Sequence, residues 1–190
     1  MADMLSRARL EFAFRRLRRA LPGMLVLAAF AAEVSPAPAA ELDKDTLRLL
    51  LWQAPTTLNP HFAQGAKDQI ASRIVYEPLA SFNARGELVP FLAAEIPSLG
   101  NGEVAADGKS VLWKLKHDIK WSDGMPFTAK DVLFTYNYVT NPDVGSGNAS
   151  IYKTVEKVEA LDDFTVKIDF KKVNPAWALP FVGVKGMIIP

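Results

Sequence analysis

The strongest constraint on the fold is the segment 106–136, which carries a turn, an alternating strand, a second turn and a helix start in close succession. Asp107-Gly108 is a strong turn signal. After it, apolar and polar side chains alternate, which predicts a strand whose buried face is made by Val111, Trp113 and Leu115. We expect Trp113 and Trp121 to be core aromatics, because large rings mainly supply packing area.

The predicted strand leads into a helix through a short corner, residues 121–131, that has the pattern of a helix cap. Ser122-Asp123-Gly124 predicts a turn, and Pro126 restricts the approach to the helix. Thr128 can cap the helix by accepting from backbone N–H groups of its first turn. Asp131, three residues later, places a negative charge where the helix dipole favours it. The corner is therefore expected to be structural.

The remainder of the helix and the segments after it also show clear periodicity. Val132, Tyr136 and Val139 fall at i, i+4 and i+7 and predict a buried stripe, and Asn141-Pro142 ends the helix. The polar residues 144–150 are expected to form a loop. Residues 155–161 and 164–170 alternate on either side of Asp162-Asp163, which predicts a hairpin.

The segments nearer the N-terminus mix short strands with a helix. Residues 46–52 are expected to form a buried strand. A helix is expected to begin near Lys67, to present Ile70, Ile74 and Val75 on one face, and to end before Pro78. The other expected elements are a hairpin, 79–82 with 88–91, and a short helix, 175–181. This mixture is α/β in the broad sense (mixed α+β), with a mixed sheet and short hairpins, and excludes a helical bundle.

Composition excludes several classes of function. The chain has no cysteine, so disulfides, thiolate metal sites and a cysteine nucleophile are excluded. Six of the 22 basic residues lie in residues 1–39 against three acidic residues, so the remainder is slightly acidic. It has no cluster of Lys and Arg of the kind that a nucleic-acid surface needs.

Residues 1–39 have the organisation of a secretory signal peptide. An arginine-rich start precedes the apolar run 21–32, which is shorter than the ~20 residues that span a bilayer. Ala37-Pro38-Ala39 follows as a small-residue cleavage site, which predicts export to the periplasm with cleavage near Ala39. The pairs Arg15-Arg16 and Arg18-Arg19 leave the Sec and twin-arginine routes open. The alternative is a basic amphipathic helix on a membrane or partner.

The residues that could carry chemistry are few. The chain has two histidines, His61 and His117, and neither has a second histidine at ligand spacing. We therefore predict no catalytic residue, no metal site and no cofactor, and we expect His61 to lie in an open loop. The alternative is an exported hydrolase that uses His61 with Asp68 or Glu77, which requires a buried His61 within hydrogen-bond reach of a carboxylate.

An ordered set of motifs carries a family resemblance. The set comprises LNPH at 58–61, YEPL at 76–79, NARGELVP at 83–90, FLAAE at 91–95, residues 106–136 and ALDDFTVKIDFKK at 160–172. The chain resembles the N-terminal part of the family 5 solute-binding proteins of peptide, oligopeptide and nickel ABC transporters. The resemblance covers nearly all of residues 46–190.

The resemblance implies a periplasmic binding protein fold of type II, whose two lobes close on a peptide and deliver it to a membrane permease. It implies a monomeric, non-catalytic protein that meets the membrane only through the permease. The matching ligand positions are Gln64, Gly65 and Ala66, after His61, with Asn148 from the loop 144–150. A peptide backbone can pair with such a segment as an added strand, which tolerates many side chains.

Family members are considerably longer, so residues 40–190 are expected to be the N-terminal portion of the solute-binding domain, without the second lobe. We expect a fragment or truncated frame that cannot close a cleft by hinge motion. Apolar surface should remain exposed where further structure would pack. A nickel complex, haem or sugar stays open as an alternative ligand.

Overall fold

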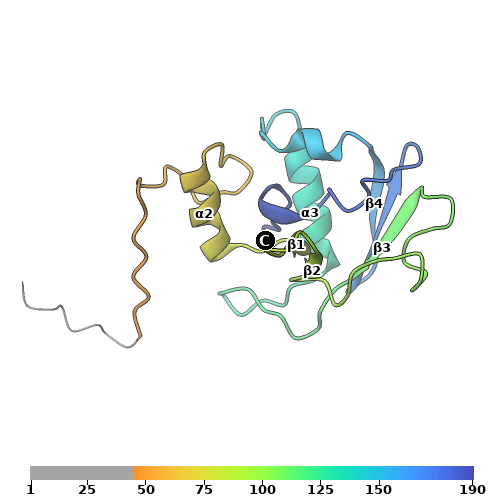
Figure 1. Ribbon diagram of the computed structural model, residues 1–190, viewed down its shortest axis with the longest axis horizontal. Helices are drawn as coiled ribbons and strands as arrows, with labels where there is room; N and C mark the ends of the chain where they lie inside the picture. Colours follow the sequence, from red (N-terminus) through yellow and green to blue (C-terminus); the bar gives the residue numbers. More distant parts are fainter. Residues whose placement is uncertain (1–44) are drawn as a thin grey trace, which may run out of the picture. The chain divides into compact units, whose positions relative to one another are not determined.

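The computed structural model describes residues 45–190 (Figure 1). The predicted signal peptide, residues 1–39, lies outside the described residues. Leu50–Pro190 form one compact unit. Within the described part of the chain, no helix combines the length and apolar character needed to cross a bilayer.

Short strands and two α-helices alternate along the described residues. In chain order, the elements are α2 (Ala66–Val75), β1 (Ala80–Phe82), β2 (Leu88–Pro90), β3 (Ser110–Lys114), α3 (Ala129–Thr140), the 3-10 helix η1 (Ala149–Tyr152), β4 (Val155–Asp162), β5 (Thr165–Phe170) and the 3-10 helix η2 (Gly183–Lys185). The predicted helices at 67 and 128 and both predicted hairpins are confirmed.

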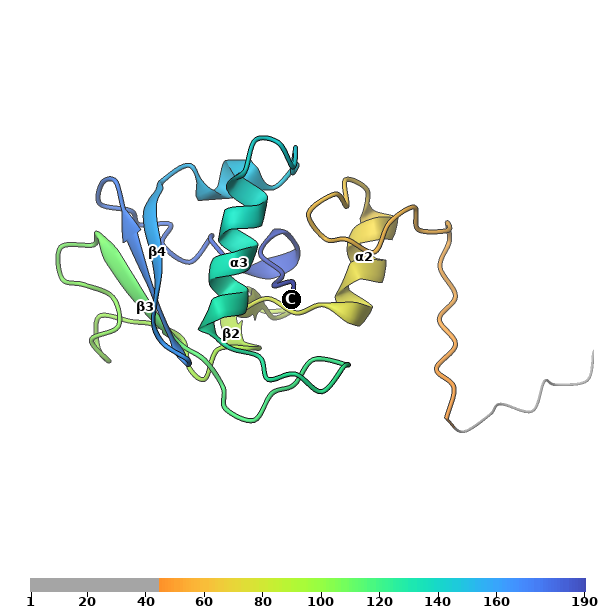
Figure 2. The ribbon, with the colours of Figure 1, turned by 180° about the vertical axis from the view of Figure 1, so that it is seen from behind.

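The main sheet has the order β3-β5-β4, and both of its strand pairs are antiparallel. Trp113 lies opposite Val166 in the β3–β5 register, and both side chains are fully buried. α3 packs across β4 and β5, as the reverse view shows (Figure 2). Its buried side chains Val132 and Val139 join the same apolar core. The predicted buried face of β3 is therefore confirmed.

The corner before α3 folds as its capping pattern predicts. Trp121 and Met125 close the turn with a backbone hydrogen bond, Trp121 N to Met125 O, of 2.8 Å. The Thr128 N–H donates to Asp131 Oδ2 at 2.7 Å, and the Thr128 side chain accepts from Lys130 N at 3.3 Å. The result is a complete capping box. Trp121 is half-buried and meets the Phe127 ring edge-on, with centroids 5.9 Å apart.

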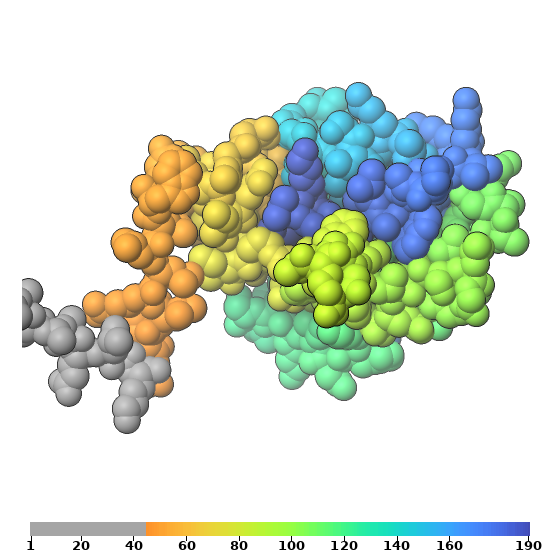
Figure 3. Space-filling model, viewed as in Figure 1, coloured from red at the N-terminus to blue at the C-terminus, as the bar shows by residue number. Residues whose placement is uncertain are grey.

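The end of the chain returns beside the segment that leaves α2. Ile188 N donates to Glu77 O and Leu79 N donates to Phe181 O, both at 3.0 Å. Pro78 and Met187 form an antiparallel bridge, whereas Ala80 and Val182 form a parallel one. All pairs of named strands are antiparallel. The parallel pairing expected of a mixed sheet is therefore limited to the bridge between Ala80 and Val182. In the space-filling view, the dark blue C-terminal residues lie among the segments that follow α2 and α3 (Figure 3).

Two local predictions are wrong. Residues 46–52 form no strand, and Leu47, Leu49, Leu50 and Trp52 are exposed. No described strand supplies the ladder hydrogen bonds that residues 46–52 would need. Residues 175–181 form turns, with a backbone hydrogen bond from Leu179 N to Ala176 O, and the segment ends at Phe181 in a left-handed backbone with φ of 63°. The apolar residues Ile70, Ile74 and Val75 of α2 are exposed, whereas the helix buries Asp68, Ala71 and Ser72.

Removing the cap of α3 should weaken the whole unit. Thr128→Ala should lower the free energy of unfolding by about 1 kcal/mol, because backbone N–H groups at the helix start lose their acceptor. Thr128→Ser keeps the oxygen and should retain most of the stability. Urea unfolding followed by circular dichroism measures both variants. Equal losses in the two variants would show that the hydroxyl is not the source of the effect.

Candidate functional site

Two loops that are far apart in sequence meet above the N-terminal end of α2 and the C-terminal end of α3. We call residues 59–66 the first loop and residues 144–150 the second loop. The carbonyl of His61 accepts from Gly147 N and from Ser146 Oγ, each at 3.2 Å. The Asn148 side chain donates from Nδ2 to Pro60 O at 3.1 Å. These three hydrogen bonds make one continuous surface from two separate segments.

Gln64 lies at the junction of the two loops. Its side-chain amide lies directly against Gly147, where a Cβ would collide with it. A larger residue at 147 would push the Gln64 amide away from the second loop. Gln64 is exposed, so its amide is open to solvent although it lies against Gly147 of the second loop.

Gly65 and Ala66 begin the helix that follows. Gly65 is the N-cap of α2, has an extended backbone, and accepts from Asp68 N at 3.1 Å and Gln69 N at 3.0 Å through its carbonyl. Ala66 is the first residue of α2 and is exposed. The first N–H groups of a helix have no intrahelical acceptor, so this end of α2 favours carboxylates and other hydrogen-bond acceptors.

Asn148 and His61 are buried, contrary to the expectation that His61 lies in an open loop. The His61 side chain is fully buried, with its ring centroid 6.2 Å from that of Tyr138 on α3. Its Nδ1 is 3.5 Å from Asn148 Nδ2. Burial lowers the pKa of His61 to about 4, and the backbone of Met187 opposes this only partly. The prediction failed because the residues that cover His61 are distant in sequence.

Asp68 fixes the chain that approaches the first loop. Its Oδ1 accepts from Thr56 N at 2.6 Å, from Thr57 N at 3.4 Å and from Lys67 Nζ at 3.1 Å. The Thr56 hydroxyl lies 3.0 Å from both carboxylate oxygens. These donors, the Thr56 N–H above all, hold the pKa of Asp68 at about 2. Asp68 is therefore an anchor of residues 56–57 rather than a partner of His61.

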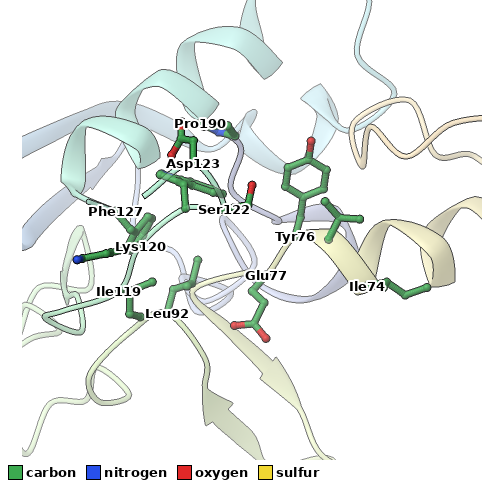
Figure 4. Close-up of a pocket in the computed structure, with 12 residues that line it drawn as sticks. Ile74, Tyr76, Glu77, Leu92, Ile119, Lys120, Ser122, Asp123, Phe127 and Pro190 are labelled. Atoms are coloured by element: carbon green, nitrogen blue, oxygen red, sulfur yellow. The ribbon is translucent and has the colours of Figure 1, made fainter. Parts of the chain in front are cut away.

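Sequence reasoning missed an apolar groove at the other end of α2. The groove has a volume of about 490 Å³ and is lined by Ile74, Val75, Tyr76, Glu77, Leu92, Ile119, Lys120, Trp121, Ser122, Asp123, Phe127 and Pro190. In Figure 4, Leu92, Ile119 and Phe127 gather on one side of the groove, and Tyr76 lies on the other. The corner residues Trp121, Ser122 and Asp123 therefore also border a groove, which their capping pattern gives no means to predict.

The residues that could support metal or acid–base chemistry do not converge. Among residues 45–190, no three His, Asp or Glu side chains lie close enough together to hold a metal ion. The side-chain contact of His61 is with an amide, and the carboxylate of Asp68 is bound by Thr56, Thr57 and Lys67. Glu77 lines the groove, of which His61 is not a part. The site thus consists of a buried polar junction, formed by His61 and Asn148, and an exposed edge that includes Gln64 and Ala66.

The fold is that of the type II periplasmic binding proteins. Residues 87–190 match the family model described as "Bacterial extracellular solute-binding proteins, family 5 Middle". The chain belongs to the family 5 extracellular solute-binding proteins.

Curated relatives are similar over much of this chain. The glutathione-binding protein GsiB of Pectobacterium atrosepticum is 31% identical over 116 residues, which are 61% of this chain and 21% of GsiB. The oligopeptide-binding protein OppA of Bacillus subtilis is 29% identical over 131 residues, 65% of this chain and 23% of OppA. The matched segment is thus about a fifth of each relative's length.

Solved structures match a larger share of the chain. The OppA of Haemophilus influenzae, crystallised with the peptide RPPGFSPFR, has a TM-score of 0.64 and 25% identity, over 72% of this chain and 29% of that protein. NikZ from Campylobacter jejuni, in complex with Ni(L-His), has a TM-score of 0.59 and 25% identity, over 73% of this chain and 26% of that protein.

Asp68→Asn should loosen the approach to the first loop. The substitution replaces the carboxylate that Thr56 N and Lys67 Nζ contact with a neutral amide. The urea midpoint at neutral pH should therefore fall. Because folding lowers this carboxyl pKa from 3.8 to about 2, the wild type should lose stability as pH falls between these values. Asp68→Asn should lack that acid-dependent loss.

Asp163→Asn is the matched control, because this turn aspartate is exposed. It should leave the urea midpoint nearly unchanged. If both substitutions lower the midpoint equally at neutral pH, Asp68 is not the anchor of residues 56–57.

Proposed function

We propose that this chain supplies one wall of the peptide site in the substrate-binding component of an ABC importer. The component would bind peptides in the periplasm and deliver them to the permease subunits in the membrane. The family assignment supports this role, and so do the relatives named for binding glutathione and oligopeptides. The observation that carries the proposal for this chain is the Gln64 amide, which lies against Gly147 and is open to solvent.

The ligand would meet the first loop at Gln64, Gly65 and Ala66. An extended peptide could add its backbone to this edge, because the edge offers an exposed amide side chain and the first N–H groups of α2. Asn148 and His61 belong to the same proposed site, but their burial gives them a supporting role. In this assignment they hold the loops in place, and Gln64, Gly65 and Ala66 touch the peptide.

The role is binding without catalysis. The competing hydrolase hypothesis requires a carboxylate within hydrogen-bond reach of His61, and the carboxylate nearest in sequence is already bound by Thr56, Thr57 and Lys67. The family is one of transport binding proteins. We therefore propose a monomeric, non-enzymatic component that is exported to the periplasm and contacts the membrane through its permease.

The ligand could also be a small solute other than a peptide. The likeness to NikZ keeps a nickel complex open, since that protein was crystallised with Ni(L-His). For this chain, a nickel role for His61 finds little support, because the ring is fully buried and its neighbour is an amide. The peptide proposal is favoured because the exposed edge consists of hydrogen-bonding groups that match a peptide backbone.

One wall should bind peptides only weakly. We expect isothermal titration with a mixed tripeptide library to give no micromolar affinity, because a single wall buries little of the ligand. At about 10 mM tripeptide, NMR should still show amide shift changes at Gln64, Gly65, Ala66 and Gly147, consistent with a Kd of about 1 mM or weaker. Gln64→Ala should reduce these changes several-fold.

Gln53→Ala is the matched control, because Gln53 is also an exposed glutamine but lies outside both loops. It should leave the shift changes intact. Micromolar binding would contradict the single-wall proposal. Shift changes confined to other segments would remove the site from the first loop.

A further inference from the structure

We propose that His61 is a positioning residue: its neutral ring holds the first and second loops together, and its protonation releases them. This proposal rests on the proposed function in one respect only, namely that Gln64, Gly65 and Ala66 meet the ligand. It adds a regulatory property to that site, which is loss of the ligand edge in mildly acidic solution.

The hydrogen bonds around Asn148 define the state of the ring. Pro60 O can only accept, so the atom of Asn148 that lies 3.1 Å from it is the amide donor. The same amide nitrogen lies 3.5 Å from His61 Nδ1, a weak contact that requires a lone pair on Nδ1. With Nδ1 facing the Asn148 amide, the proton of the neutral ring is on the other nitrogen, Nε2.

Protonation would place an N–H donor on Nδ1 against the amide donor of Asn148. Two donors facing each other repel, and the contact across the junction is lost. The hydrogen bonds to His61 O come from Gly147 and Ser146, next to Asn148, so they depend on the same local arrangement. A change at one ring nitrogen thus acts on both loops at once.

No charge on the surrounding elements offsets a proton on the ring. From α3, the facing group is the phenol ring of Tyr138, whose hydroxyl accepts from Asn59. From the second loop, the facing groups are Ser146 and Asn148, which are uncharged. From the C-terminal segment, it is the uncharged backbone of Met187, which favours the protonated ring but offsets the effect of burial only partly. Among residues 45–190, no carboxylate forms an ion pair with His61, so the imidazolium would be buried unpaired.

The linkage between protonation and opening sets the pH range. Burial lowers the pKa of His61 from 6.5 to about 4 in the closed state, and opening the loops would return it to its ordinary value. The open state therefore binds more protons than the closed state between these two pH values, and acid favours opening. The equilibrium constant for opening should rise by up to tenfold per pH unit as pH falls from 6.5 to about 4.

Hydrogen exchange of the Gly147 amide reports on this opening directly, because its N–H donates to His61 O. The experiment uses the 190-residue chain and NMR-detected exchange, expressed as protection factors so that the intrinsic pH dependence cancels. Between pH 6.5 and about 4.5, the protection factor of Gly147 should fall about 40-fold. The Gly86 amide, which donates to Asn83 O in the β1–β2 turn, should keep a constant protection factor.

Three variants separate the titration of the ring from a structural role. His61→Asn keeps an acceptor for Asn148, and His61→Phe keeps the ring volume, but neither titrates in this range. Both should abolish the pH dependence of Gly147 protection. His117→Asn, the matched control at the second histidine, should retain the fall of about 40-fold.

A constant protection factor for Gly147 in the wild type would overturn the proposal, and so would an equal fall in His61→Phe and His61→Asn. Should both variants fail to fold, NMR titration of the His61 ring in the wild type decides: a native pKa near 4 supports the proposal and one near 6.5 overturns it. None of these measurements contains a ligand, so they succeed or fail independently of the peptide titration at neutral pH.

Discussion

The packing of α3 against β4 and β5 is the interaction on which the rest of this structure depends. Val132 and Val139 are fully buried against a sheet whose own core includes Trp113, Val166 and Ile168. Each such side chain contributes roughly 1.5–3 kcal/mol when it leaves water. The second loop leaves the C-terminal end of α3, and Tyr138 on α3 packs against His61. If α3 shifts, both loops therefore shift with it.

The candidate site is a polar junction built on that apolar frame. A buried amide, a buried imidazole and two loop carbonyls share a few hydrogen bonds, and a buried polar group without its partner is costly. Such a junction is specific but sensitive to protonation. Asp68 adds a second anchor, and its carboxyl pKa of about 2 keeps it ionised through the range in which His61 would open the loops. The side chains of His61 and Asp68 therefore take up protons in different pH ranges.

Local patterns predicted the elements whose causes are local. The Thr128–Asp131 cap, the Asp107-Gly108 turn and the alternating strands depend on neighbours a few residues away, and each formed as expected. The errors involve partners that are distant or unpaired. Residues 46–52 have a strand pattern but no described partner strand, and Phe181 takes a left-handed backbone that residue type alone does not reveal.

The sequence by itself determined the α/β class and the family resemblance, because short-range periodicity and ordered motifs carry that information. Only the tertiary structure decided that His61 and Asn148 lie buried between two loops, and that Gln64 rests on Gly147. These contacts join residues more than eighty positions apart. Burial at such a distance depends on how α3 packs on its sheet, which no local pattern encodes.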